Sequence, residues 1–210
     1  MNTIYFDNAA TTRIDENVLK EMLPYLNENY GNASAIYSIG RKSKQAIEEA
    51  REKISRVFNC KNNEIYFTSG GSESNNTIIK GIAHKYNSKG NHIITSQIEH
   101  MSVIETCKDL ENEGFEVTYI PVDKDGTIDI RKLKESIRKT TILISIMYAN
   151  NEIGTIQPIR EIGEIARENK IFFHTDAVQA AGSIKIDVQD MNIDSLSLSG
   201  HKFYGPKGIG

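Results

Sequence analysis

The stretch that decides the fold is TILISIMYANNEIGTIQPIREIGEIARENKIFFHTD, residues 141–176. It begins and ends with short runs that are apolar almost throughout, residues 141–149 and 171–176. Between them, the apolar residues of segment 158–169 recur at helical spacing, and Pro158 stands at its start, where a helix tolerates proline. Strands that are apolar on both sides are typical of a parallel sheet covered on both faces. The stretch therefore predicts strand, helix and strand of one parallel sheet.

The same alternation continues in both directions along the chain. Further strands are expected at residues 3–7, 64–69, 92–96, 115–122 and 195–199. Further helices are expected from about residue 15, up to about residue 58, after residue 72, and at residues 103–113 and 128–139. No repeat, low-complexity tract or linker interrupts this pattern. We predict an α/β fold with a mostly parallel central sheet and helices on both faces.

The overall composition excludes several functional classes. Hydrophobic residues make up 39% of the 210 residues, which is typical of a globular protein with a core. The net charge is −3, with acids and bases mixed, so no general attraction to nucleic acid or to an anionic membrane is expected. The longest apolar run, ILISIM at residues 142–147, is too short to span a bilayer. The first residues, MNTIYFDNAATT, have no secretory signal features, and we predict a cytoplasmic protein.

The two cysteines fit neither a disulfide framework nor a metal site. Cys107 shares a predicted helical face with Val103 and Leu110, so we expect a buried structural thiol. Cys60 lies in the polar turn NCKNNE, where we expect it to be exposed. We predict that neither cysteine is a catalytic nucleophile.

Small and polar residues follow the predicted strand at 64–69. Gly70, Gly71 and Ser72 connect that strand to a helix, and glycines at a helix start let the backbone approach an oxyanion. This indicates a phosphate cradle, although the P-loop and GxGxxG patterns are absent. A tight turn in which Ser72 simply caps the helix explains the same residues equally well.

Single polar residues also end other predicted strands. His100 follows strand 92–96, where it is either a capping residue or a functional one. Asn150 and Asn151 follow strand 141–149, and asparagines often only make turns. Asp176 ends strand 171–176, where it either caps the next helix or holds a ring nitrogen protonated, as pyridoxal phosphate (PLP) enzymes require.

The end of the sequence adds a lysine to this set. The segment SLSLSGHK places Ser199, His201 and Lys202 at one more strand end, in a turn of small residues. Lysine can form a Schiff base with an aldehyde when its ammonium group loses its proton. Because ligands gather at the carboxyl ends of parallel strands, all of these residues are expected at one edge of the sheet.

The motifs YFDNAATT, TSGGSESNN, IEHMSV, YANNEIG, HTDAVQAAG and SGHKFYGPKGIG resemble, in this order and spacing, the cysteine desulfurases of the class V aminotransferase family. The form of the last motif resembles the housekeeping iron–sulfur and nitrogen-fixation branch. The resemblance covers essentially the whole chain. It implies an aspartate-aminotransferase-like large domain of fold type I at residues 15–210, incomplete at its C-terminus, after an N-terminal arm at residues 1–14. The C-terminal small domain is then expected to be absent.

The resemblance assigns the ring contacts of the cofactor PLP. It implies that Lys202 forms the Schiff base with PLP and that Asp176 pairs with the pyridine nitrogen. Gln179 would hydrogen-bond the phenolic oxygen, and His100 would stack on the ring and handle protons. No metal is implied.

The resemblance also assigns the remaining contacts. It implies that Gly71, Ser72, Ser199 and His201 bind the phosphate, and that Asn151 contacts the cofactor or the substrate carboxylate. The family's motif GNPSSxH appears here as GNASAIY, residues 31–37, which bears on loop order or fine specificity at the substrate entrance.

The implied reaction removes sulfur from L-cysteine, leaving L-alanine and an enzyme persulfide for iron–sulfur cluster assembly and other sulfur transfer. Its implied partners are a sulfur-acceptor or iron–sulfur scaffold protein and a second copy in a homodimer. The family's persulfide cysteine and substrate-binding arginine are not in these 210 residues, so we expect the chain alone to be inactive. Two alternatives are another PLP-dependent aminotransferase or lyase of class V, and a truncated chain with no turnover.

Overall fold

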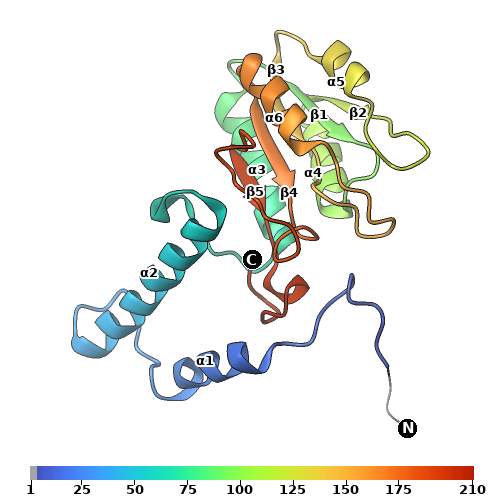
Figure 1. Cartoon of the computed structure of the whole chain (residues 1–210). Helices are drawn as coiled ribbons and strands as arrows, with labels where there is room; N and C mark the ends of the chain where they lie inside the picture. The colour runs from blue at the N-terminus through green and yellow to red at the C-terminus, as the bar shows by residue number, and fades with distance from the viewer. Residues whose placement is uncertain (1–3) are drawn as a thin grey trace.

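The computed structural model describes residues 4–210, and its centre is a sheet of five parallel strands (Figure 1). The strands are β1 His92–Ser96, β2 Glu116–Ile120, β3 Thr141–Ser145, β4 Phe172–Asp176 and β5 Ser195–Ser197. Their order across the sheet is β2-β1-β3-β4-β5. Because every neighbouring pair is parallel, all carboxyl ends lie at one edge. The predicted parallel sheet is confirmed, and β1, β3 and β4 end within a few residues of the predicted positions.

Helices cover both faces of this sheet (Figure 1). They are α3 Gly71–Tyr86 and α4 Met101–Asn112 on one face, and α5 Ile130–Ser136 and α6 Ile159–Glu168 on the other. Ile79, Val103 and Cys107 pack with Ile93 and Leu143 in the first layer. In the second layer, α6 packs Ile162 and Ile165 against side chains of the opposite sheet face. The two layers form because neighbouring residues of each strand point to opposite faces of the sheet.

A buried histidine on β4 hydrogen-bonds to both neighbouring strands. His174 on β4 lies between two hydroxyls, with Nδ1 2.9 Å from Ser145 Oγ on β3 and Nε2 3.0 Å from Ser197 Oγ on β5. Burial lowers the pKa of His174 to about 3, so the ring is neutral and exchanges hydrogen bonds with both neighbours. The carboxyl half of the sheet, which carries Asp176, is thereby tied across three strands.

Two N-terminal helices lie apart from the sheet (Figure 1). They are α1 Glu16–Asn27 and α2 Ser38–Phe58. The predicted start of α1 is confirmed, because the Asp15 side chain caps it by accepting a hydrogen bond from the Asn17 N–H. No residue of α1 is buried, and apolar side chains such as Leu26, 70% exposed, face outward. The apolar side chains of α1 and α2 therefore have few packing partners among the described residues.

Two of the predicted strands are wrong. Residues 4–7 of the strand expected at 3–7 have no regular structure, and residue 3 lies outside the described part. The segment 64–69 contains the end of a 3₁₀ turn, Asn62–Glu64, and then extended chain. Thr68 exchanges two 2.9 Å backbone hydrogen bonds with Gly210, and no strand pairs with the rest of the segment among residues 4–210. A segment with a strand-like sequence needs a neighbouring strand before its backbone N–H and C=O groups can form the hydrogen bonds of a sheet.

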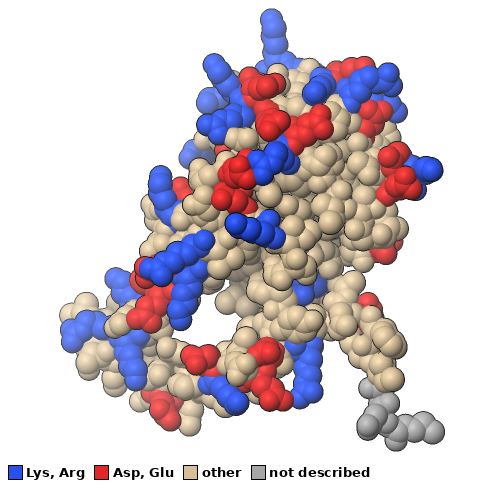
Figure 2. All heavy atoms as spheres, in the orientation of Figure 1, with Lys and Arg blue, Asp and Glu red and all other residues tan. Residues whose placement is uncertain are grey.

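The surface carries both signs of charge. Figure 2 shows Lys and Arg interspersed with Asp and Glu over the face in view. Several are paired across elements, including Lys80 with Asp109 at 2.8 Å and Arg160 with Asp190. Among residues 4–210, no helix is both long enough and apolar enough to cross a membrane.

Candidate active site

The residues expected at the strand ends do meet at the carboxyl edge of the sheet. Asp176 is the last residue of β4, and Lys202 ends a 3₁₀ turn, Gly200–Lys202, shortly after β5. His100 stands between β1 and α4, where it is the N-cap of the helix. Hydrogen bonds through Asn75 and Ser102 link Asp176 to His100. Lys202 Nζ and the side chain of Gln179, three residues after Asp176, donate to one backbone oxygen, so these groups lie near one another.

The N-terminal arm completes this site, which the sequence reasoning did not foresee. Thr12 is buried, and its backbone N–H and side-chain hydroxyl both donate to the His201 carbonyl at 2.9 Å. His201 Nδ1 lies 3.0 Å from Thr11 Oγ1, and Tyr204 N–H donates to Thr12 Oγ1 at 2.8 Å. The motif YFDNAATT therefore fixes the turn that carries Lys202 through hydrogen bonds.

Lys202 and Gln179 converge on one backbone oxygen of this arm. Gln179 Nε2 donates to the Ala9 carbonyl at 2.9 Å, and Lys202 Nζ donates to the same oxygen. Burial lowers the pKa of Lys202, although Asp7 and Asp176 act in the opposite direction. The site thus holds an amine with an increased neutral fraction beside an amide donor.

Asp176 is a buried carboxylate held by two hydrogen bonds. Asn75 Nδ2 donates to its Oδ2 at 2.7 Å, and the Val178 N–H donates to its Oδ1 at 3.0 Å. Burial raises the pKa of Asp176, and these hydrogen bonds together with His100 and Lys202 partly offset that rise. A buried carboxylate is stabilised when a positively charged group pairs with it. Asp176 does not cap a following helix, because a series of turns follows β4.

The glycines before α3 form a cradle beside Ser199. Gly70 has φ +156° and ψ 179°, a conformation that side chains disfavour, and it is the N-cap of α3. A Cβ on Gly71 would lie 2.7 Å from Val178 Cγ2. Ser72 is exposed in the first turn, so its predicted alternative role as N-cap is wrong. The bare helix start and buried Ser199 are suited to an anion.

The two asparagines after β3 differ in their surroundings. Asn150 is buried and organises the turn, since its Oδ1 accepts the N–H groups of Glu152 at 2.9 Å and Ile153 at 3.1 Å. Its Nδ2 donates to the Ile98 carbonyl at 3.0 Å, which ties this turn to the loop before His100. Asn151 is half-buried beside it, and its contact with cofactor or substrate stays a prediction.

Two buried polar residues of this site were missed from the sequence. Asn75, on α3, contacts Asp176 as described above. Glu99 Oε1 accepts the Ser96 hydroxyl at 2.6 Å and the Met147 N–H at 2.8 Å, so it joins the ends of β1 and β3. Burial, with a smaller contribution from Asp176, raises the pKa of Glu99 to about 8, although the hydrogen bonds from Ser96 and Met147 act in the opposite direction. Both residues lie within quoted motifs, Asn75 in TSGGSESNN and Glu99 in IEHMSV, but a motif does not reveal that a side chain is buried.

Neither cysteine has the environment of a nucleophile. Cys107 is buried on α4, as predicted, and burial raises the pKa of its thiol to about 12. Cys60 is half-buried against the core, so its predicted exposure is wrong, and burial raises its pKa as well. Both thiols are predominantly protonated at neutral pH.

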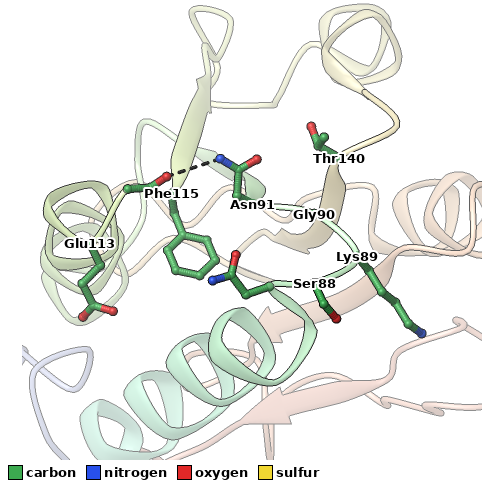
Figure 3. A pocket seen from close by; sticks show the side chains of 9 residues that line it. Ser88, Lys89, Gly90, Asn91, Glu113, Phe115 and Thr140 are labelled. Carbon is green, nitrogen blue, oxygen red and sulfur yellow. Dashed lines mark hydrogen bonds between the residues drawn. The ribbon is translucent and has the colours of Figure 1, made fainter.

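A hollow of about 390 Å³ lies at the opposite, amino edge of the sheet (Figure 3). It is lined by residues that precede β1, β2 and β3, among them Asn91, Phe115 and Thr140. Asn91 Nδ2 donates to the Gly114 carbonyl at 3.3 Å across it. None of the strand-end residues borders this hollow, so it is separate from the candidate site.

The family of the chain follows from comparison with known proteins. The family model described as aminotransferase class-V matches residues 4–210, and the chain belongs to this family. Class V aminotransferases, including the cysteine desulfurases, are PLP-dependent enzymes of fold type I, which confirms the predicted fold class and cofactor.

Individual relatives are similar over the whole chain. The chain is 61% identical over 207 residues to the cysteine desulfurase IscS of Methanosarcina thermophila, covering 99% of this chain and 51% of that protein. A solved NifS-like protein superposes with TM-score 0.97 at 43% identity, covering 100% of this chain and 58% of that one. A structure titled SspA in complex with cysteine gives TM-score 0.96 at 50% identity, covering 99% and 60%. The chain spans about half the length of the curated relatives it matches.

Proposed function

We propose that this chain carries the cofactor-holding side of a cysteine desulfurase active site. The reaction would remove sulfur from L-cysteine and leave L-alanine, with the sulfur passing to a thiolate as a persulfide. The convergence of Lys202 Nζ and Gln179 Nε2 on one oxygen, near the buried Asp176, carries this proposal.

The chemistry of the residues at the carboxyl edge supports PLP as the group they would hold. Gly71 and Ser72, at the start of α3, would hold the phosphate together with Ser199 and His201. The lack of space beside Gly71 supports a backbone approach that no side chain could replace. When bound, PLP supplies an electron sink for the electrons released at the substrate α-carbon.

The side chains of this chain then have distinct tasks. Lys202 would hold the aldehyde group covalently through Nζ, and the burial that lowers its pKa favours the neutral amine needed for this. Asp176 would keep the ring nitrogen protonated, and Gln179 would donate to the phenolic oxygen. His100 would carry a proton at Nε2, because its Nδ1 already accepts the Ser102 N–H at 3.1 Å. Asn151 would contact the cofactor or the substrate carboxylate.

The acceptor thiolate would come from outside this chain. Cys107 is buried with its pKa raised to about 12, and the pKa of Cys60 is raised too. This observation supports a second candidate reading, in which the 210 residues bind PLP but do not turn over L-cysteine alone. A class V aminotransferase or lyase reaction is distinguished by its product, a keto acid in place of alanine.

The partners and location are part of the same proposal. Relatives bearing the name IscS support a role in supplying sulfur to an iron–sulfur scaffold or another acceptor protein. The exposed apolar residues of the arm, α1 and α2, such as Phe6 at 88%, support pairing with a second copy. Free cysteines are typical of the cytoplasm, where we place the protein.

The first experiment is borohydride reduction of the chain with PLP, followed by intact mass and peptide mapping. We expect one pyridoxyl group on Lys202, none in Lys202→Ala, and an unchanged group in Lys207→Ala, which changes an exposed lysine shortly after this turn. Labelling elsewhere would refute the assignment. Incubation with L-cysteine and a small thiol acceptor then tests the reaction, and formation of a keto acid without alanine would refute desulfuration.

A further inference from the structure

A continuous line of side chains connects Asp176 to His100 behind the candidate site. Asn75 is 1% exposed in α3, and its Nδ2 lies 2.7 Å from Asp176 Oδ2 and 2.9 Å from Ser102 Oγ. Ser102 Oγ in turn lies 2.8 Å from His100 Nδ1. Asp176 and Asn75 come from elements 101 residues apart in the sequence, so the contact is tertiary.

The direction of each hydrogen bond in this line follows from the groups themselves. A carboxylate only accepts, so the amide atom facing Asp176 is the nitrogen, which has two N–H bonds and no free lone pair. One N–H points to Asp176, and the other points to Ser102 Oγ. The Ser102 hydroxyl then accepts from Asn75 and keeps its own proton for another partner.

That partner is the imidazole of His100. The Ser102 backbone N–H lies 3.1 Å from Nδ1 and can only donate, so Nδ1 carries a lone pair and not a proton. The Ser102 hydroxyl faces the same nitrogen, and its proton points there. In the neutral ring the proton is consequently on Nε2, and a proton on Nδ1 would face the Ser102 N–H directly.

We propose that Asn75 and Ser102 are positioning residues that fix the tautomer of His100 and couple it to Asp176. The catalytic proton is then handled at Nε2 alone, and a change in the orientation of Asp176 reaches His100 through two side chains. The role in catalysis rests on the proposed function, whereas the tautomer is a property of the chain itself.

The surroundings of Asn75 indicate that the function of its side chain lies in its two N–H donors. Its Oδ1 is buried and has no hydrogen-bond partner among the described residues, so the amide is not retained for its carbonyl. Burying an unpaired carbonyl costs free energy, and an apolar residue of similar shape would avoid that cost. The hydrogen bonds to Asp176 and Ser102, and not packing, therefore explain why an amide side chain occupies this buried position.

The test is ¹⁵N NMR of the imidazoles at about pH 8.5, where an ordinary histidine is neutral, with His100→Gln to assign the signal. In the wild type we expect a pyrrole-like Nε2 and a pyridine-like Nδ1. In Ser102→Ala and Asn75→Leu we expect a measurable share of the opposite tautomer. Ser102→Thr, which keeps the hydroxyl, and Asn76→Ala, on the same helix, should behave as the wild type.

Two results would overturn the inference: both tautomers in the wild type, or a single unchanged tautomer in both Ser102→Ala and Asn75→Leu. If Asn75→Leu does not fold, the half-buried Ser102→Ala decides. PLP titration tests the coupling separately. We expect roughly tenfold weaker binding in Asn75→Leu, the size of one charge-assisted hydrogen bond, and a smaller change in Ser102→Ala. Equal affinities would refute the link to Asp176, whereas failure of the wild type to bind PLP would refute the proposed function and leave the tautomer result standing.

Discussion

We expect Glu99 to make the free energy of unfolding of this protein fall as pH rises through the neutral range. The carboxyl is 7% exposed, and burial raises its pKa from 4.5 to about 8. Because the folded state holds a proton that the unfolded state releases, the contribution of Glu99 is complete below pH 4.5 and is lost as pH approaches 8. The loss amounts to about 1.4 kcal/mol per pH unit, on the order of 5 kcal/mol over the window.

Substitution of Glu99 by glutamine isolates this contribution. The amide oxygen can still accept from Ser96 and Met147, but the side chain no longer titrates. The new amide N–H groups add a cost that does not depend on pH. The difference in free energy of unfolding, wild type minus Glu99→Gln, should therefore fall by about 3 kcal/mol between about pH 5 and about pH 7.

The assay is urea unfolding of both proteins, followed by circular dichroism at several pH values. Glu168→Gln, which changes an exposed carboxylate of α6, serves as the control and should give a difference that stays constant with pH. A constant difference for Glu99→Gln as well would mean that Glu99 is ionised in the folded protein. The reasoning from burial would then be refuted.

Three further predictions concern other parts of the structure. Gly71→Ala would place its Cβ 2.7 Å from Val178 Cγ2, so we expect a destabilisation of about 1–3 kcal/mol in urea unfolding and weaker PLP binding. An unchanged free energy of unfolding together with an unchanged PLP affinity would contradict the close packing. His174, with its pKa lowered to about 3, should remain neutral in NMR titrations down to about pH 4, and its contribution to stability is lost as pH falls from 6.5 towards 3; a midpoint near 6.5 would refute this. Cys107 should react with a thiol reagent much more slowly than Cys60 in the folded chain, because burial raises its pKa to about 12, and equal rates would contradict its burial.

The strands that the sequence predicted correctly are those with their own apolar pattern and with partners in the chain. The segments 92–96 and 141–145 are buried at every position, so short runs composed mainly of Ile, Leu, Thr and Ser were a sufficient signal. Among residues 4–210, the segment 64–69 pairs with another segment only at Thr68, and it does not form a strand. Composition shows that a segment can be a strand, whereas pairing depends on which other segments lie beside it.

The sequence by itself determined the α/β class, the parallel sheet and the strand-end positions of His100, Asp176 and Lys202. Local periodicity and the common direction of parallel strands are sufficient for these conclusions. Only the tertiary structure decided that the N-terminal arm holds the Lys202 turn, that Asn75 contacts Asp176, and that Glu99 is buried. Hydrogen bonds between distant segments and loss of water from a side chain depend on packing in three dimensions, which no spacing along the chain records.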